Sequence, residues 1–250
     1  MSTSRYQKQL AMMQRIHPRL PRPQLLERAF VDVWLQGATG NDLQRVLDAG
    51  CGFQNGLVVH YPGRLWSVGI DADFHVVQQN RDLDAKAVAS CGGIPLRSAS
   101  VDLIFHRDVL EHLQDPKAAM GEFFRVLKPG GAVVISTVNV KNPAMWSVRF
   151  VPMWFRAAVR SASFGPELGE NAPTFYRANT RAQIVSLLER EGFQILQCDY
   201  YPTFVWYFRF ATPLLLLFTY MNRLLDIVGL TRFYGGILVV ASKPAASDRR

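Results

Sequence analysis

Four short apolar runs constrain the fold of this chain more than any other feature of its sequence. They span Arg45 to Asp48, Leu65 to Asp71, Val101 to His106 and Ala132 to Thr137. Each run is apolar along almost its whole length, which is typical of parallel strands that helices cover on both faces. We therefore predict an α/β fold with a doubly wound, mostly parallel sheet.

Helix signals lie between and after these runs. Asp115 followed by Pro116 predicts the start of one helix, and Thr180 predicts the start of another. Two further strands are predicted at 193–198 and 236–241. Because no covered crossover of the usual kind joins them, we expect this pair to run antiparallel at the edge of the sheet.

The length of 250 residues suits one large α/β domain with additions. We predict an N-terminal helical arm at 1–40, with a helix that begins at Pro23, and the α/β domain at 41–250. Two aromatic-rich insertions interrupt the regular pattern, at 140–178 and 201–234. Both are interpreted as helical caps on the domain.

The charge and the cysteines limit the partners and the compartment. A net charge of +8 favours nucleic acid or an anionic membrane surface as a partner, and it also fits a generically basic protein. Cys51, Cys91 and Cys198 are far apart and lack the spacing of a zinc site, so we expect a reducing compartment and no metal. The basic N-terminus lacks the apolar core of a signal peptide, which predicts a cytoplasmic location.

The first run leads directly into a glycine-containing turn in the segment RVLDAGCGFQNG, residues 45–56. Gly50 and Gly52 match the first two glycines of a dinucleotide-binding fingerprint, but Asn55 takes the place of the third, which disfavours an NAD-dependent oxidoreductase. No Gly-Lys-Ser/Thr follows, so a phosphate-binding P-loop is excluded. The turn still allows a ligand to approach the backbone closely.

Two acidic residues narrow the type of ligand. Asp71 ends the second run, where a carboxylate can accept hydrogen bonds from both hydroxyls of a ribose. Asp48 lies beside the glycine turn, where it would repel a pyrophosphate and attract a cation. The pattern predicts a site for a nucleoside that carries positive charge.

Four segments in this order, VLDAGCG, VGID, SVDLIFHRDVLEHLQDP and FFRVLKPGGAVVIST, resemble the class I S-adenosylmethionine-dependent methyltransferases. The resemblance is to the small-molecule branch with LEHL and RVLKPGG signatures, which is methyltransferase type 11-like, and it covers roughly residues 44–138. It implies a Rossmann-like sheet of seven strands with the last one antiparallel, and S-adenosyl-L-methionine as the cofactor.

The same resemblance implies roles for individual residues. Asp48, Gly50 and Gly52 would line the amino-acid and sulfonium side of the cofactor, and Asp71 would hold the ribose hydroxyls. The acid that often meets the adenine amine in this family is replaced by Ser90. Backbone atoms of Cys91 are an alternative partner for the adenine.

His112, within the LEHL signature, is the candidate catalytic residue. A neutral imidazole near pH 7 can take a proton from an acceptor hydroxyl, and in this family the same histidine often only orders its loop. Both roles remain open for His112. We expect His112→Ala to lose turnover and to keep cofactor binding if the residue is a base.

The insertions predict the class of methyl acceptor. Residues 142–160 mix tryptophan and phenylalanine with arginine, which suits either a lid over an apolar substrate or a helix in a membrane interface. Within 201–230, the longest stretch without a charged residue in the part expected to be helical runs from Phe210 to Asn222 and has 13 residues. A membrane-spanning helix needs about 20. We predict O- or C-methylation of a hydrophobic acceptor such as a quinone, a polyprenyl compound or a lipid-linked molecule, with peripheral contact to an anionic membrane at its inner face.

Three other functions remain as alternatives. The chain could be a non-catalytic S-adenosylmethionine-binding module on the same fold, or a methyltransferase for a soluble secondary metabolite. A nucleic-acid methyltransferase would use the positive charge. It is disfavoured because the chain has no Asn/Asp-Pro-Pro-Tyr motif.

Overall fold

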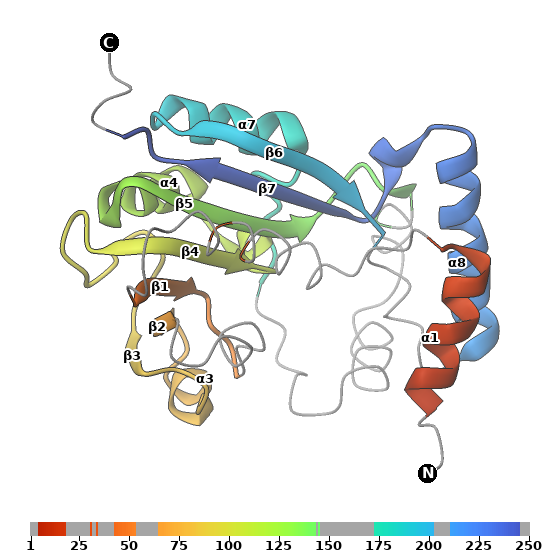
Figure 1. The fold of residues 1–250 in the computed structure, drawn as a ribbon, viewed down its shortest axis with the longest axis horizontal. Coiled ribbons are helices and arrows are strands. Elements are labelled where there is room, and N and C mark those ends of the chain that lie inside the picture. Colours follow the sequence, from red (N-terminus) through yellow and green to blue (C-terminus); the bar gives the residue numbers. More distant parts are fainter. Residues whose placement is uncertain are drawn as a thin grey trace. The chain divides into compact units, whose positions relative to one another are not determined.

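The fold is taken from a computed structural model that describes residues 5–18, 43–53, 65–143, 173–202 and 211–245, together with 31, 34 and 145. These residues form a seven-stranded sheet with the order β3-β2-β1-β4-β5-β7-β6 (Figure 1). The strands are β1 Gln44–Ala49, β2 Leu65–Asp71, β3 Ala85–Val88, β4 Val101–Arg107, β5 Leu127–Val138, β6 Gln194–Tyr201 and β7 Gly236–Ser242.

The four apolar runs form the centre of the sheet as parallel strands, which confirms the predicted fold class. β1 lies between β2 and β4, and Leu47 is in register with Val68 on one side and Ile104 on the other. Leu47 and Ile104 are fully buried. The continuous apolar character of these runs therefore follows from burial on both faces.

β3 was not predicted as a strand. Its four residues, AKAV, alternate between half-buried and exposed positions at the end of the sheet. An edge strand this short contains no apolar run, so the sequence offers little that distinguishes it from a loop.

β5 begins at Leu127, earlier than the predicted run from Ala132, and it includes the Lys128-Pro129-Gly130-Gly131 segment. Val101 pairs with Leu127, but Leu103 pairs with Ala132, so extra residues bulge out of β5. A Cβ on Gly131 would lie 2.9 Å from the carbonyl oxygen of Asp102. The second glycine thus allows the two strands to approach closely beside the bulge.

β7, the last strand of the chain, runs antiparallel to β5, as the resemblance to the methyltransferases implied. The N–H of Lys243 donates to Gly131 O, and the N–H of Gly130 donates to Lys243 O, both at 2.8 Å. At the other end of β5, Asn139 N donates to Gly235 O at 2.8 Å, so the pairing runs in opposite chain directions. β7 lies between β5 and β6, and β6 is the edge strand (Figure 1).

The two helices predicted from capping signals are confirmed. α4, Pro116–Val126, has Asp115 as its N-cap, and α7, Arg181–Arg190, has Thr180 as its N-cap. A shorter helix, α3, Phe74–Gln79, follows β2 and is capped by Asp73. α4 turns Met120, Phe123 and Val126 inward, and α7 turns Ile184 and Leu188 inward.

The chain divides into two compact units that are described separately. Unit 1 consists of 1–23, 138–173 and 200–237, and unit 2 consists of 24–137, 174–199 and 238–250. The predicted domain boundary at residue 40 lies outside the described residues. So do nearly all of the helix predicted from Pro23 and of the insertion at 142–160.

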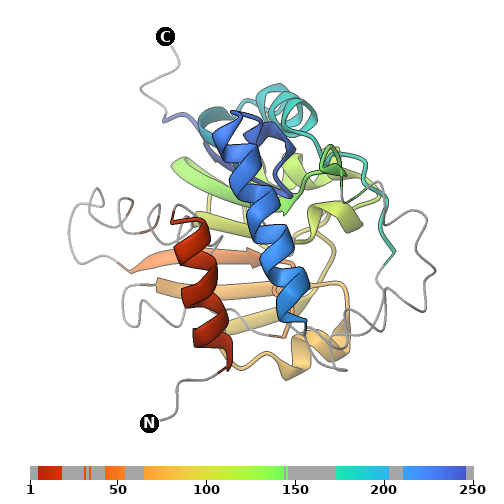
Figure 2. The same cartoon turned by 90° about the vertical axis from the view of Figure 1, so that its right-hand side faces the viewer.

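Unit 1 is built around two helices that run side by side in the same direction (Figure 2). They are α1, Arg5–Ile16, and α8, Thr212–Ile227. Gln9 Nε2 donates to Thr212 Oγ1 at 3.1 Å near the start of both helices. Beyond their other ends, His17 Nε2 hydrogen-bonds with Tyr234 Oη at 3.2 Å, and that hydroxyl donates to Asn222 O at 3.3 Å.

Within the described residues, no helix has both the length and the apolar character needed to cross a bilayer.

Candidate functional site

The glycine turn after β1 folds back onto the end of β2. The N–H groups of Gly50 and Cys51 both donate to Ile70 O, at 2.8 and 3.0 Å. Gly50 has a φ of 86° and Gly52 a φ of 56°, which side chains rarely allow. The two predicted glycines are therefore required by the backbone conformation of the turn.

Asp71 joins this turn to the residues that follow β2. Its Oδ2 accepts a hydrogen bond from Gly52 N at 3.2 Å, and its Oδ1 accepts one from Asp73 N at 3.0 Å. Each carboxylate oxygen can accept a second hydrogen bond, so two acceptor positions remain for a ligand such as a ribose. The backbone thus orients Asp71 in the way its predicted role needs.

Asn80 supports the same turn and was not foreseen from the sequence. It is buried, and its Nδ2 donates to the carbonyl oxygens of Cys51 and Gly52 at 3.3 and 3.0 Å. Lys86 Nζ donates to Asn80 O at 2.8 Å. A single asparagine at the end of α3 carries no motif, so only the tertiary structure reveals this role.

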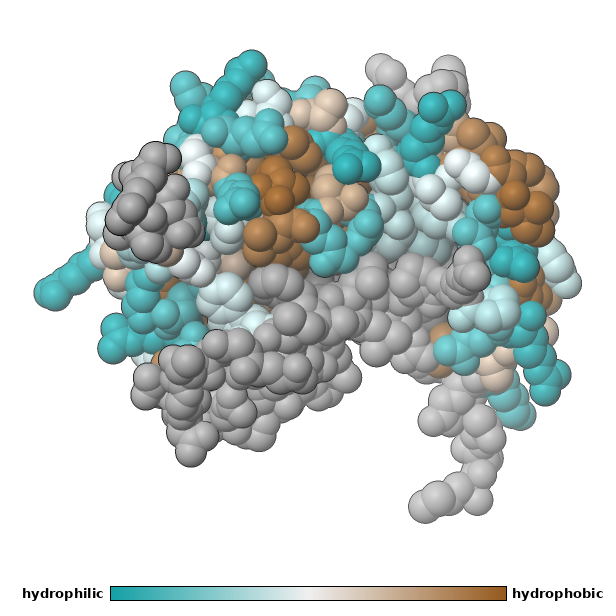
Figure 3. Space-filling view, turned by 45° about the horizontal axis from the view of Figure 1, so that its top comes forward, coloured by the Kyte–Doolittle hydropathy of each residue, from teal (hydrophilic) through white to brown (hydrophobic). Residues whose placement is uncertain are grey.

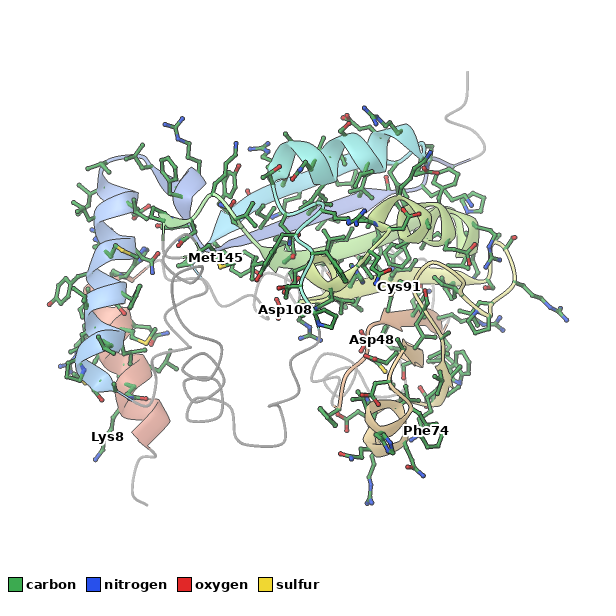
Figure 4. The ribbon with its side chains drawn as sticks, turned by 180° about the vertical axis from the view of Figure 1, so that it is seen from behind. Lys8, Asp48, Phe74, Cys91, Asp108 and Met145 are labelled. Carbon is green, nitrogen blue, oxygen red and sulfur yellow. The ribbon has the colours of Figure 1, made fainter. Side chains whose placement is uncertain are left out.

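Asp48 and Asp71 together make this end of the sheet negative. Asp48 is 2% exposed. Burial, and after it the Asp48 and Asp71 carboxylates, raise the pKa of Cys51 to about 12. The pKa of Cys91, which follows β3, is also raised to about 12, by burial and then by Asp71 and Asp48. Both carboxylates therefore act on the same small region, where a cationic ligand is favoured. Figure 4 labels Asp48 and Cys91 in this region.

The space beside the turn differs between its two glycines. Among the described residues, apart from the two chain neighbours of Gly52, no atom lies within 4 Å of a Cβ added to Gly52, so these residues leave room for a ligand beside the backbone. At Gly50 the same Cβ would lie 2.2 Å from Cγ2 of Val109, which follows β4. Gly50 thus lets the β1 turn and the β4 turn pack together, whereas Gly52 faces open space.

We expect Gly50→Ala to damage both stability and cofactor binding. Overpacking against Val109 costs about 1–3 kcal/mol, and the left-handed backbone costs about 1–2 kcal/mol more. Gly130→Ala is the matched control, since Gly130 has a φ of 80° but open space around its Cβ. Thermal unfolding and calorimetric binding should show that Val109→Ala partly rescues Gly50→Ala; no rescue would contradict the packing explanation.

His106, near the end of β4, holds the last residue of β1. It is fully buried, and its Nδ1 donates to Ala49 O at 2.9 Å. Because a carbonyl only accepts, the proton lies on Nδ1, and within the described structure Nε2 has no hydrogen-bond partner. Burial lowers the pKa of His106 to about 4, so the imidazole is neutral near pH 7.

The residues after β4 carry a second unusual backbone conformation. Asp108 has a φ of 54°, in the left-handed region that non-glycine residues seldom adopt. Its N–H donates to Ser136 O of β5 at 2.9 Å. Strained backbone of this kind is common in functional sites, and Asp108 lies at the same end of the sheet as Asp48 and Cys91 (Figure 4).

The LEHL signature forms a 3-10 turn, η2, Leu110–His112, and its buried charged residue is Glu111. Glu111 Oε2 accepts a hydrogen bond from Thr137 Oγ1 at 2.7 Å, and Asn179 Nδ2 donates to the same Thr137 oxygen at 2.8 Å. Glu111 O also accepts from Phe175 N at 2.8 Å. Glu111 therefore ties the turn to β5 and to the segment before α7.

His112 is half-buried at the end of this turn, and its N–H donates to Val109 O at 2.9 Å. The turn thus has its backbone fixed by Glu111 and Val109. The role of His112, as a base or as a scaffold, stays a prediction.

The loop after β3 is fixed beside Asp71. Ala89 N donates to Asp71 O at 2.9 Å, and Ile94 N donates to Glu122 Oε2 at 2.7 Å. Arg125 pairs with Glu122 and lowers the pKa of that carboxyl through a hydrogen bond. Ser90, at the position of the expected acid, is exposed, and Cys91 next to it is buried.

Among the residues that the structure describes, no three His, Cys, Asp or Glu side chains gather as metal ligands would.

Comparison with known sequences assigns the central part of the chain to a family. Residues 47–135 match the model of a methyltransferase domain. A probable S-adenosylmethionine-dependent methyltransferase of Mycolicibacterium smegmatis is 32% identical over 155 residues, which cover 60% of this chain and 52% of that protein. A ubiquinone biosynthesis O-methyltransferase of Idiomarina loihiensis is 30% identical over 132 residues, 49% of this chain and 52% of that protein. The chain thus spans about half the length of these relatives.

Comparison with solved structures supports the fold. The [4+2]-cyclase SpnF superposes with a TM-score of 0.56 over 87% of this chain and 82% of its own, at 19% identity. Gly50, Gly52 and Asp71 fit a nucleoside cofactor, since the turn leaves open space at Gly52 and free acceptor positions on Asp71. Residues 47–135 thus match a methyltransferase domain, and these similarities support a class I S-adenosylmethionine-dependent methyltransferase.

Proposed function

We propose that the chain transfers a methyl group from S-adenosylmethionine to a lipid-like acceptor, of the quinone or polyprenyl class, at the surface of an anionic membrane. The observation that carries the cofactor part is the position of Asp48 and Asp71 near the carboxyl ends of the adjacent parallel strands β1 and β2, with Asp71 bonded to Gly52 of the glycine turn. Their negative charge suits a ligand that carries both an ammonium and a sulfonium group.

Three residues of unit 2 would have separate roles in binding the cofactor. Asp71 would accept the ribose hydrogen bonds, and Asp48 would attract the positively charged end of the cofactor. Gly52 would let the ligand lie against the backbone. When bound, S-adenosylmethionine supplies a methyl group that is activated by its sulfonium. The protein then has mainly to position the acceptor and to accept its proton.

Two features support a lipid-like acceptor. The relative from Idiomarina loihiensis is named for O-methylation in ubiquinone biosynthesis. The sequence has aromatic-rich insertions at 140–178 and 201–234, which suit an apolar substrate. The relative's name favours transfer to oxygen over transfer to carbon.

His112 is proposed as the group that takes the proton from the acceptor. His112→Ala should lose at least about 100-fold in turnover, the usual lower bound for a general base, and keep its affinity for S-adenosylmethionine. Turnover against pH and calorimetric binding would be measured together. Glu111→Gln is the comparison for a positioning role, because it keeps an acceptor for Thr137. Normal turnover in His112→Ala would leave only a scaffold role.

The test of the proposed function is transfer of tritium from methyl-labelled S-adenosylmethionine into a lipid extract of the source cell. Label in the organic phase, absent with Asp71→Ala, is the expected result. Label only in the aqueous phase would favour the alternative, a methyltransferase for a soluble metabolite.

Binding without any transfer would favour a non-catalytic module. A structure of similar fold is named a [4+2]-cyclase, so the fold by itself does not decide that the reaction is methyl transfer.

A further inference from the structure

Helix α8 in unit 1 buries two polar residues while several of its large apolar residues are exposed. Its buried residues are Leu215, Thr219 and Asn222, which share one face. Thr219 Oγ1 donates to Leu215 O at 2.7 Å, and Asn222 Nδ2 donates to Phe218 O at 2.9 Å, so both polar side chains bond to their own helix. Both side chains thus donate to carbonyl oxygens of their own helix, which reduces the cost of burying them.

The opposite face of α8 exposes large apolar side chains. Leu217 is 62% exposed, Leu224 is 58% exposed and Ile227 is 66% exposed. We call this face the apolar stripe; it consists of Leu214, Leu217, Tyr220, Leu224, Ile227 and Val228, all at least 39% exposed. Figure 3 shows hydrophobic side chains gathered over this helix. An exposed apolar face of this kind marks a contact surface.

The stripe carries no charge of its own. The two charged residues of α8, Arg223 and Asp226, pair with each other at 3.1 Å and lie off the stripe. On the neighbouring helix α1, Lys8, Met12 and Arg15 are exposed and share one face, because they are spaced by four and three residues. Unit 1 therefore combines an uncharged apolar helix face with a basic one.

The charge of the whole chain is concentrated in the same unit. Unit 1 contains 12 Lys and Arg and 3 Asp and Glu, a net charge of +9. Unit 2 contains 16 Lys and Arg and 17 Asp and Glu, a net charge of −1. The basic character of the chain thus belongs to the unit with the apolar stripe and not to the unit with the cofactor site.

We propose that the exposed faces of α8 and α1 bind the surface of an anionic lipid bilayer. The apolar stripe enters the boundary between headgroups and acyl chains, and Lys8 and Arg15 contact the anionic headgroups. This deepens the proposed function by naming the surface that meets the membrane. The inference rests on the proposed function in one respect only: a lipid-like acceptor explains why the chain would bind a membrane.

The charge distribution favours a bilayer over the other partners of an apolar face. A second copy of the chain would bring two units of charge +9 together, which opposes association. A nucleic acid could pair with the basic face but would leave the apolar stripe exposed to water. An anionic bilayer complements both the charge and the apolar surface.

The test is flotation of the full chain with vesicles of phosphatidylglycerol and phosphatidylcholine in equal parts, compared with vesicles of phosphatidylcholine alone. The chain should float with the anionic vesicles, and less so at high salt. Combined Leu217→Ser, Leu224→Ser and Ile227→Ser should weaken binding at least about 100-fold. Combined Lys8→Glu and Arg15→Glu should weaken it at least about tenfold.

Matched controls come from unit 2. Leu196→Ser removes an apolar side chain that is 53% exposed on β6, and Lys117→Glu reverses an exposed charge on α4. Both should bind the anionic vesicles like the unchanged chain. Circular dichroism would verify that each variant is folded.

Three outcomes would overturn the inference. They are no flotation of the unchanged chain, equal binding of the serine variant and the unchanged chain, and a dimer in light scattering that the serine variant converts to a monomer. Because flotation needs no methyl transfer, a chain that binds vesicles and transfers no methyl would contradict the proposed function and leave this inference intact.

Discussion

Asp71→Ala should abolish measurable binding of S-adenosylmethionine. In our proposal two ribose hydroxyls donate to this carboxylate, and hydrogen bonds to a charged group contribute about 1.5–3 kcal/mol each. Their loss predicts at least about a 100-fold rise in Kd by calorimetry. The turn would also lose the acceptor that holds Gly52 N and Asp73 N.

Two variants separate the role of this site from a general loss of stability. Asp71→Asn should fail as well, because an amide would place an NH₂ group against one of the two backbone N–H donors. Asp84→Ala is the control: Asp84 Oδ2 also accepts from backbone of β2, from Ser67 N at 2.7 Å, but lies away from the glycine turn. Unchanged affinity in Asp71→Ala would refute the assignment of the cofactor site.

The folded protein should lose about 3 kcal/mol of stability through His106 as the pH falls from about 6.5 to about 4. Burial lowers the pKa of His106 from 6.5 to about 4, so between these values the unfolded chain binds the proton that the folded chain excludes. Stability therefore rises with pH across this window, and the contribution is complete above about pH 6.5. Urea unfolding at a series of pH values would measure it.

His106→Phe should remove this part of the pH dependence. The ring would keep the edge-to-face contact with Phe123, whose centroid lies 5.0 Å away, but would leave Ala49 O without its donor. The variant should be less stable at pH 7 and approach the unchanged chain near pH 4. His75→Phe, at an exposed position on α3, controls for loss of an imidazole. An identical slope in His106→Phe and the unchanged chain would contradict the prediction.

The local structure of the candidate site could be predicted where short segments of the sequence determine it. Gly50 and Gly52 require backbone conformations that few other residues adopt, and Asp71 ends an apolar run. Each of these signals can be recognised from one short segment, without knowledge of the rest of the fold. The fold class and the cofactor could be recognised for the same reason, since four such segments follow one another in order.

The parts that could not be predicted depend on partners distant in the chain. Asn80 contacts carbonyls 28 and 29 residues away, and His106 contacts Ala49 57 residues away. Glu111 meets Thr137 after an interval of 26 residues. A lone asparagine, histidine or glutamate next to an apolar run gives no sign of which distant group it will bind.

The insertion at 201–234 shows a third kind of limit. Its sequence allowed either a lid or a membrane contact, because periodicity shows that two faces differ and not which face is buried. In the structure Thr219 and Asn222 are the buried polar residues, and Leu217, Leu224 and Ile227 are exposed. This distribution of exposed apolar residues is the basis of the membrane contact that we propose for α8.

The central claim is that the acceptor is lipid-like and that the site of Asp48 and Asp71 supplies the methyl donor. The most direct measurement is the rate of S-adenosylhomocysteine formation with a polyprenyl hydroquinone in anionic vesicles, compared with the same hydroquinone without its tail. We predict that product forms with the tailed acceptor, at one S-adenosylhomocysteine per methylated quinone, and that Asp71→Ala abolishes it. Equal rates with both acceptors, or no product with either while S-adenosylmethionine still binds, would contradict the account.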